Sequence, residues 1–326
     1  MFNLISSINA NVAMHSRNIM KENGGKSSSE NNISLFGSNS NGNSLTLADD
    51  LTPLAEKYKA ASYDDIERAG GNGLVDVDAR QGEIGDCNLL ATLRALRNSE
   101  NGQKALSEVM KYDAENASWS FNFKTKDFAK EDASPVVITK DDVDKAIAEK
   151  KVSKGDDDVS AIELAVAKYL GQVHKNGTED NIMKQISDQG IKHRAARGAA
   201  ADDYLNGVVS HIGYLFTGNI SKSIKGEEDT KNALADFDKT TDMMVFAQIG
   251  GDTSAKDTFN GGGSNANPFV MLGDDQILGN HAYTVCDVSG DQVTLRESNN
   301  PSATITATIE ELLNCTGNNY FYTFSY

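Results

Sequence analysis

The chain has 326 residues, of which 39% are hydrophobic and 24% charged, and its formal net charge is −16. A chain of this length can bury a sizeable core in one large domain or in two lobes. The acidic balance argues against nucleic acid or an anionic membrane surface as the main partner, since both require a basic footprint. Three cysteines are too few for a disulfide framework, and no apolar run approaches the roughly 20 residues that span a bilayer.

The first 50 residues differ from the rest, because 20 of them are Ser or Asn. Such a segment buries too little apolar surface to offset its ordering entropy, so we expect residues 1–58 to be a disordered tail. Within the tail, Ile5, Ile8, Val12 and Ile19 share one helical face. The stretch "INANVAMHSRNI" (8–19) resembles the start of bacterial flagellins, and the composition is similar to type III secretion signals. A plain flexible tail is the alternative.

The export resemblance has consequences for partners and location. It implies an export chaperone or a secretion apparatus as the partner of the tail. It also implies secretion by a non-classical, type III-like route, into a host cell in the case of an effector. Without export, the protein is expected in the cytoplasm.

From about residue 51 the chain becomes globular in character. Helical spacing runs through residues 51–70, and the stretch 70–85 is predicted to be a glycine-rich loop. Residues 88–110 predict one helix, and "SWSFNF" (118–123) and "SPVVIT" (134–139) predict short strands. At "SAIELAVAKYLG", Ser160 and Glu163 form an S-x-x-E capping box that predicts a helix start.

After residue 240 the pattern changes to strands. They are expected at "MMVFAQI", "HAYTVCDV", "QVTLRES", "SATITATI" and "NYFYTFSY". Helices followed by strands predict an α+β fold with a helical first lobe (59–220) and a strand-rich second lobe (221–326).

Cys87 follows "QGEIGD" and immediately precedes a predicted helix. A helix start offers unpaired backbone N–H groups and the positive end of the dipole, which stabilise a thiolate. The same N–H groups, together with the side-chain amide of Gln81, are candidates for an oxyanion hole. A buried structural cysteine is the alternative, since free cysteine is among the most buried residue types.

His281 is the strongest candidate for the general base among five histidines. In "GNHAYTVCDV" it stands where a glycine-rich loop enters a strand, and the next strand, "QVTLRESNNP", predicts an antiparallel hairpin. A three-residue loop at 289–291 places His281 opposite Asn299, whereas a loop one residue longer selects Asn300. Glu297 is a diagonal neighbour on the same face. Any of the three would orient the imidazole in a nucleophile–base triad.

These residues together resemble the calpain-like cysteine peptidases of the papain superfamily. "QGEIGDCNLLATLRAL" resembles the nucleophile segment, "GNHAYTV" the histidine segment and "NNP" the Asn-Pro of the third triad member. "IELAVAKYLG" and "GYLFTG" are similar to two further family landmarks, so the resemblance covers about residues 60–326. It implies a papain-like two-lobed fold with the nucleophile in the helical lobe and the His/Asn hairpin in the strand-rich lobe.

The resemblance assigns roles by position. Cys87 is the nucleophile, Gln81 a donor to the oxyanion and His281 the base and then the acid. The Asn-Pro points to Asn300, whereas the hairpin count points to Asn299. The implied reaction is hydrolysis of internal peptide bonds in protein substrates through a thioester.

Two departures and one cofactor question accompany the resemblance. Asn88 and Ser302 stand where the family usually has tryptophan. No cofactor is required by the thiol chemistry. Calcium, which animal calpains need, takes oxygen ligands, and the acidic runs "KGDDDVS" and "LGDDQI" are candidates for supplying them.

Two other functions compete with a secreted peptidase effector. The same thiol enzyme would act as a deamidase or acyltransferase on a host protein if something other than water reached the thioester. A binding module that retains only a remnant of the triad is the third hypothesis. In that case Cys87 would alkylate no faster than Cys286 or Cys315.

Overall fold

The structure is a computed structural model that describes eleven segments of the chain, and residues 1–61 lie outside them. These segments are 62–82, 86–124, 135–176, 209–219, 221–224, 226–249, 269–273, 275–279, 281–300, 302–315 and 318–326. The predicted tail and its amphipathic helix therefore fall outside the described residues. So do the proposed lobe boundaries at residues 58 and 220, which stay predictions.

The helical region begins with a 3-10 turn, η1 (Tyr63–Asp65), and continues with α3 (Cys87–Asn98) and α4 (Glu100–Val109). The helix expected over 51–70 is wrong in its described part, since only η1 is helical there. The single helix expected over 88–110 is also wrong. Ser99 has extended backbone angles, and its side chain accepts a hydrogen bond from the Gly102 N–H, so it caps a second helix.

A three-stranded antiparallel sheet follows, in the order β1 (Met110–Asp113), β2 (Ser118–Phe121), β3 (Val136–Thr139). The strands β2 and β3 confirm two predicted segments. After them come α5 (Lys140–Ala148), α6 (Asp157–Asn176) and α8 (Val209–Thr217).

The start of α6 differs from the predicted capping box. Asp156 precedes the helix, and its carboxylate accepts from the Asp158 N–H at 2.8 Å. The Ser160 hydroxyl instead donates to the Ser153 carbonyl at 2.7 Å. The box at Ser160 and Glu163 therefore does not form, because an aspartate one turn earlier caps the helix. Glu163 instead accepts hydrogen bonds from the Ser153 backbone N–H and hydroxyl.

The C-terminal region forms a six-stranded antiparallel sheet in the order β10-β9-β8-β5-β11-β4. Its strands are β4 (Lys222–Ile224), β5 (Met243–Ile249), β8 (His281–Ser289), β9 (Gln292–Arg296), β10 (Thr304–Thr308) and β11 (Asn318–Phe324). Five of these six confirm predicted strands. A two-stranded ribbon, β6 (Phe269–Leu272) and β7 (Asp275–Leu278), and the helices α9 (Glu227–Ala235) and α10 (Ile309–Asn314) complete the region.

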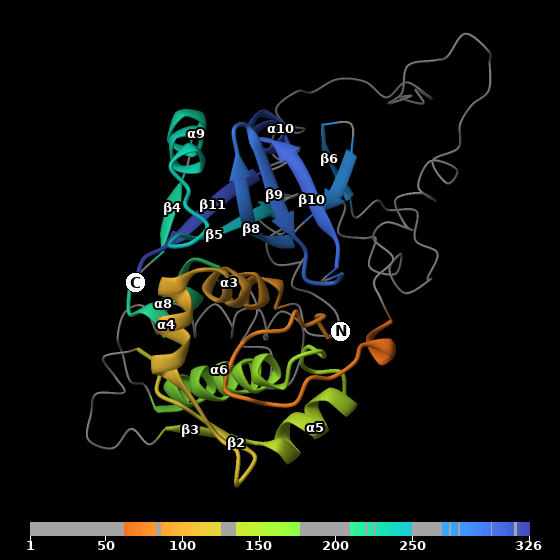
Figure 1. The fold of residues 1–326 in the computed structure, drawn as a ribbon, viewed down its shortest axis with the longest axis vertical. Helices are drawn as coiled ribbons and strands as arrows, with labels where there is room; N and C mark the ends of the chain where they lie inside the picture. Colours follow the sequence, from red (N-terminus) through yellow and green to blue (C-terminus); the bar gives the residue numbers. More distant parts are fainter. Residues whose placement is uncertain are drawn as a thin grey trace, which may run out of the picture.

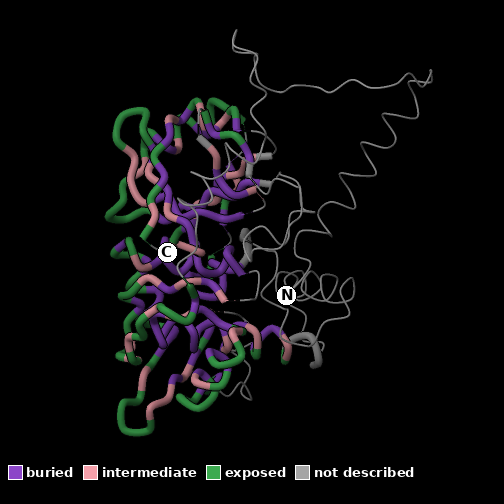
Figure 2. The backbone as a smooth tube through the Cα atoms, turned by 90° about the vertical axis from the view of Figure 1, so that its right-hand side faces the viewer, coloured by how far each residue is buried: buried purple, intermediate pink, exposed green. Residues whose placement is uncertain are grey.

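Alternation along β5 explains the layers, because successive side chains point to opposite faces of a sheet. Val245 and Ala247 join the core that includes α3, whereas Met244 and Phe246 join a second core with α9, α10 and the β6–β7 ribbon. In Figure 1, α3 lies between the six-stranded sheet and α6. Figure 2 shows buried residues in both the sheet and the helical part. The fold is mixed α+β, as expected.

The β8–β9 hairpin is closed by a two-residue turn, Gly290–Asp291, instead of the predicted three-residue loop. Gly290 has φ +63°, a conformation that glycine adopts without steric cost. A β-bulge between Val285 and Asp287 then shifts the register by one residue. Beyond the bulge Val285 pairs with Leu295, which is the pairing that the three-residue loop had predicted.

Candidate active site

Cys87 is the first residue of α3, and its side chain is 4% exposed. The backbone at Gly82, shortly before Cys87, is closely packed, because a Cβ there would lie 2.4 Å from the Val152 carbonyl oxygen. The first-turn N–H groups of a helix have no partner within the helix, and they surround Cys87 with positive partial charge. The thiol therefore lies at the positive end of the helix dipole.

Asn88 occupies the place of the family's tryptophan and lies against the thiol. The Cys87 Sγ lies 3.8 Å from the Asn88 Oδ1, and both residues are buried. An amide beside the sulfur replaces the apolar ring that the resemblance implied. The surroundings of the nucleophile are therefore more polar than in the family pattern.

His281 begins β8, where it pairs with Gln248 of β5. Its side chain is 8% exposed. Burial lowers the pKa of His281, but the charge of Cys87 and the hydrogen bond between the two side chains raise it. With the further contribution of Glu297, the pKa of His281 reaches about 10. The imidazole is therefore held as a cation between two acidic groups.

Glu297 follows β9 and is the carboxylate that contacts the imidazole. Its Oε1 lies 3.1 Å from the His281 Nε2, and the side chain is 1% exposed. Burial raises the pKa of Glu297, but the hydrogen bond to His281 and the backbone N–H groups of Asn299 and Asn300 outweigh it, so the net shift is downward. Those N–H groups donate at 2.7 and 2.6 Å. Glu297 is therefore a buried carboxylate with three partners.

The expectation that Asn300 or Asn299 orients the imidazole differs from this geometry. The Asn300 Oδ1 accepts from the Ser302 hydroxyl at 2.8 Å, and both asparagines serve Glu297 through their backbone N–H groups. The reason is the sharp turn after β9. It points successive amides at the Glu297 carboxylate, which lies on the His281 face of the hairpin. The residue count along the hairpin predicts Asn299 or Asn300 opposite His281 and Glu297 only as a diagonal neighbour.

Gln81 lies close to the same turn. Its backbone N–H donates to the Ser298 carbonyl at 3.1 Å, and its side chain is buried. This bond ties the segment before Cys87 to the segment after Glu297. The glutamine is thus brought into the neighbourhood of the triad candidates, as an oxyanion donor must be, and its assigned role stays a prediction. Residues 83–85 lie outside the described residues.

Tyr283 is a residue of the site that sequence reasoning missed. Its ring packs edge-on against the His281 imidazole, with centroids 5.1 Å apart, and its hydroxyl donates to the Leu278 carbonyl at 2.9 Å. The signal was present in "HAY", since residues two apart share a face of a strand. Tyr283 covers one edge of the imidazole, whereas the tryptophans of the family pattern stand at other positions.

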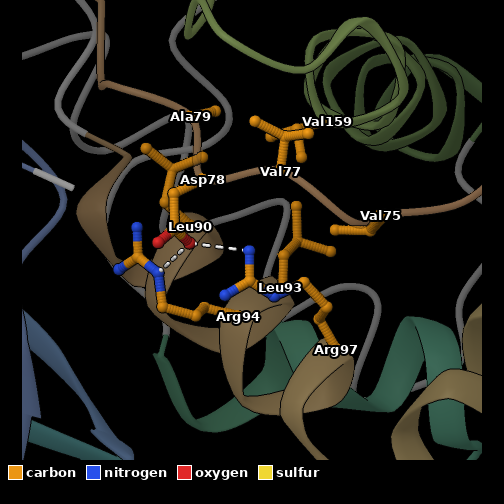
Figure 3. Close-up of a pocket in the computed structure, with 9 residues that line it drawn as sticks. All are labelled: Val75, Val77, Asp78, Ala79, Leu90, Leu93, Arg94, Arg97 and Val159. Atoms are coloured by element: carbon orange, nitrogen blue, oxygen red, sulfur yellow. Dashed lines mark hydrogen bonds and ion pairs between the residues drawn. The ribbon is translucent and has the colours of Figure 1, made fainter. Parts of the chain in front are cut away.

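A second charged cluster joins α3 to the sheet further along the helix. Asp78 forms ion pairs with Arg94 and Arg97 of α3 and with Arg296 of β9. Figure 3 shows Asp78 between Arg94 and Arg97 at the edge of a small pocket. The other lining residues are Val75, Val77, Ala79, Leu90, Leu93 and Val159. This cluster, the Asp78 clamp, was not anticipated from the sequence.

The acidic run "KGDDDVS" is occupied by contacts within the protein. Asp156 and Asp158 accept from backbone N–H groups of the 72–77 loop, and Asp157 pairs with Arg68. In the other run, "LGDDQI", Asp274 lies outside the described residues. Within the described segments, no group of three or more His, Cys, Asp or Glu side chains is arranged to hold a metal ion. A calcium site therefore stays a sequence-based prediction.

The sequence contains four other histidines. His15 and His193 lie outside the described residues, and His174 and His211 are placed on α6 and α8 by backbone alone. Cys286 and Cys315 are free thiols whose pKa values are raised by burial, that of Cys315 to about 11. None of the described helices is long and apolar enough to cross a bilayer.

The comparisons with known proteins add no relative to this picture. No family model matches the chain, and no curated protein matches it.

Proposed function

We propose that the protein is a cysteine peptidase in which Cys87, His281 and Glu297 act as nucleophile, acid–base and positioning residue. The observation that carries the proposal is a continuous chain of contacts. The Cys87 thiol interacts with the His281 imidazole, whose pKa it raises, and the imidazole Nε2 lies 3.1 Å from the Oε1 of a buried carboxylate. A nucleophile, a base and an orienting group in that order are the parts of a catalytic triad.

The charges favour a thiolate–imidazolium pair before substrate binds. His281 is held as a cation by its two acidic neighbours. A substrate carbonyl carbon is then attacked by the Cys87 sulfur, and the carbonyl electron pair moves onto oxygen. In this proposal the first-turn N–H groups of α3 and the Gln81 amide stabilise the oxyanion.

Collapse of the tetrahedral species breaks the C–N bond, and His281 gives its proton to the leaving amine. The acyl group remains on Cys87 as a thioester. His281, now neutral, takes a proton from water, whose hydroxyl attacks the thioester carbonyl. Breaking the C–S bond releases the carboxylic acid and restores the thiolate and the imidazolium.

Glu297 keeps the imidazole in one orientation and compensates its charge. A buried imidazolium without a carboxylate would be costly, because a charge in an apolar environment needs a partner. Two backbone N–H groups fix the Glu297 carboxylate in turn. The site is thus supported by groups that do not contact the substrate.

The resemblance to calpain-like peptidases adds the finer part of the proposal. The chain is proposed to have a papain-like two-lobed fold, with α3 supplying the nucleophile and the β8–β9 hairpin supplying His281 and Glu297. The substrates are proteins, and the Ser/Asn-rich tail serves export of a secreted effector. Calcium is the cofactor to be tested.

The test compares the wild type with Cys87→Ala on a cell lysate, with and without calcium. New protein N-termini are read by mass spectrometry. Cysteine-dependent new termini are the expected result, and Cys286→Ser, which alters a thiol outside the site, is the matched control. No new termini in either condition would contradict the peptidase. Intact proteins with a +1 Da change would indicate deamidation instead.

A further inference from the structure

One buried hydroxyl connects the strand that carries His281 directly to the helix that begins with Cys87. The Thr284 side chain of β8 has an exposed fraction of 0%, and its Oγ1 donates a hydrogen bond to the Ala91 carbonyl of α3 at 2.9 Å. The two residues are 193 positions apart in the chain. The bond therefore joins two separate elements and fixes where the helix lies along the strand.

The bond lies close to the proposed nucleophile on one element and to the proposed base on the other. Ala91 is four residues after Cys87, and residues four apart lie on the same face of a helix. Thr284 is three residues after His281, which begins β8, and three strand residues span about 10 Å. Ala282, between them, is buried in the core that includes α3. The contact thus stands about one helical turn from the thiol.

A second contact joins α3 to the same position of the hairpin. Thr284 pairs with Arg296 of β9, and directly opposed residues project from the same face of a sheet. Arg296 and Arg94 of α3 share the Asp78 carboxylate. The clamp acts through long side chains that can adjust, whereas threonine is stiff at χ1 and reaches the helix backbone directly. The hydroxyl therefore sets the position of α3 more narrowly than the ion pairs do.

Neither the helix nor its packing needs this hydroxyl. The Ala91 carbonyl lies inside α3, so it accepts the N–H of Ala95 one turn later, and its second lone pair is the one that Thr284 uses. A valine side chain has the same branched shape and would fill the same space. The hydroxyl thus adds a directional contact to a helix that is already hydrogen-bonded.

We propose that Thr284 is a positioning residue, whose hydroxyl sets the place of α3 along β8 and so holds the Cys87 thiol against the His281 imidazole. The inference rests on the proposed thiol chemistry and deepens it. Thr284 acts through the two elements that it joins. Its effect is large because a misplacement of about 1 Å can lower a rate on the order of a hundredfold when two groups must meet.

The charges around His281 show what a shift of α3 would change. Burial lowers the pKa of His281, but Cys87 and then Glu297 outweigh it and raise the pKa to about 10. Glu297 follows β9 and belongs to the hairpin, whereas Cys87 belongs to α3. Loosening the helix from the strand therefore weakens the contribution of Cys87 and leaves that of Glu297. The expected signature is a lower His281 pKa and a less reactive Cys87 in a protein that stays folded.

The experiment measures alkylation of Cys87 by iodoacetamide in the full chain between pH 5 and pH 9, with the modified cysteine identified by mass spectrometry. Thr284→Val removes the hydroxyl and keeps the shape, so the rate near neutral pH should fall about tenfold. Thr284→Ser keeps the hydroxyl, and its rate should stay within about twofold of the wild type. Rescue by serine distinguishes positioning through the hydroxyl from a general effect of packing.

Thr217→Val is the matched control. The Thr217 Oγ1 is also buried and donates to a helix carbonyl, that of Gly213 in α8, at 3.0 Å. The same chemical change there should leave the pH profile of Cys87 alkylation unchanged. Urea denaturation of both valine variants shows that they are folded, and Thr284→Ala replaces Thr284→Val if the latter does not fold.

NMR of the His281 ring nitrogens provides a readout that does not depend on reactivity. In the wild type they should report an imidazolium through neutral pH. In Thr284→Val the titration should move toward the ordinary value of 6.5, whereas Thr284→Ser should titrate as the wild type does.

Two results would overturn the inference. One is an alkylation profile of folded Thr284→Val that equals the wild-type profile. The other is an equal loss of reactivity in Thr284→Ser and Thr284→Val. Absence of new protein N-termini in the lysate would contradict the peptidase but would leave both readouts intact, so the failure of the proposed function and the failure of this inference are distinguishable.

Discussion

The two ends of α3 join the helical region to the sheet with opposite charges. At the N-terminal end, Cys87 interacts with His281 of β8, and the buried carboxyl of Asp86 precedes it. Toward the C-terminal end, Arg94 and Arg97 meet the Asp78 carboxylate. Acidic groups near a helix start and basic groups near its end both follow the helix dipole.

The difference lies in how each end responds to protons. The N-terminal end depends on a protonated imidazole, which is buried. The Asp78 clamp depends on guanidinium groups, which stay charged throughout the physiological range. One end can therefore be switched by pH, whereas the other holds α3 to β9 at any pH that keeps Asp78 ionised.

The largest effect is expected from Glu297→Gln. The variant keeps the shape but removes the charge that compensates His281, so kcat should fall about a thousandfold, or about 4 kcal/mol in barrier, with little change in KM. The measurement is steady-state kinetics on a substrate found by terminus mapping. Asn300→Ala is the matched control and should lose only a few-fold. Equal losses in the two variants would return the orienting role to Asn300.

The next effect concerns stability at the other end of the helix. Asp78→Ala leaves three guanidinium groups without their carboxylate, one of them on Arg94, which is 4% exposed. The free energy of unfolding should fall by about 3 kcal/mol, measured by urea denaturation. The control Asp76→Ala removes an exposed carboxylate and should cost less than about 0.5 kcal/mol. Similar losses from both variants would show that the clamp contributes nothing specific.

The smallest effect separates the two ends by pH. The pKa of His281 is raised from 6.5 to about 10, so its contribution to stability is complete below pH 6.5 and is lost as the pH rises through about 10. The pKa of Asp78 is lowered from 3.8 by its arginines, which outweigh burial, so its contribution is present above that value and lost as the pH falls.

Thermal or urea unfolding across pH should therefore show an alkaline loss on the order of 2 kcal/mol between pH 7 and 10. Asp78→Ala should keep this alkaline loss and flatten the acid side, and His281→Ala should do the reverse. An alkaline slope unchanged in His281→Ala would contradict the assignment of proton dependence to the N-terminal end.

Much of the fold was predictable because its signals are local. The strands β5 and β8 are apolar runs that are buried on both faces of the sheet, and Cys87 begins a helix whose leucines face the core. The break at Ser99 was missed because helical periodicity continues across it, although "SENG" contains both a cap and a glycine. Neighbouring aspartates likewise hid the true start of α6.

The sequence indicated the two residues that are proposed to react, but not the residues that support them. Cys87 and His281 carry signals in their own segments. The choice of Glu297 depends on a turn in which Asn299 and Asn300 present their backbone N–H groups, and side-chain reasoning does not detect backbone donors. The pairing of Asp78 with Arg296 joins segments far apart in the chain, which a single sequence does not reveal.

The bulge at Cys286 has a consequence for how the active site tolerates insertions and deletions. The two-residue turn by itself would place Ser298 and Asn300 on the same face as His281. Because the bulge adds one residue to β8, Glu297 lies on the face of His281 instead. Loss of the bulge would shift the register of the hairpin by one residue. The imidazole would then face a serine hydroxyl in place of a carboxylate. The identity of the orienting group is thus encoded in strand length as much as in the glutamate itself.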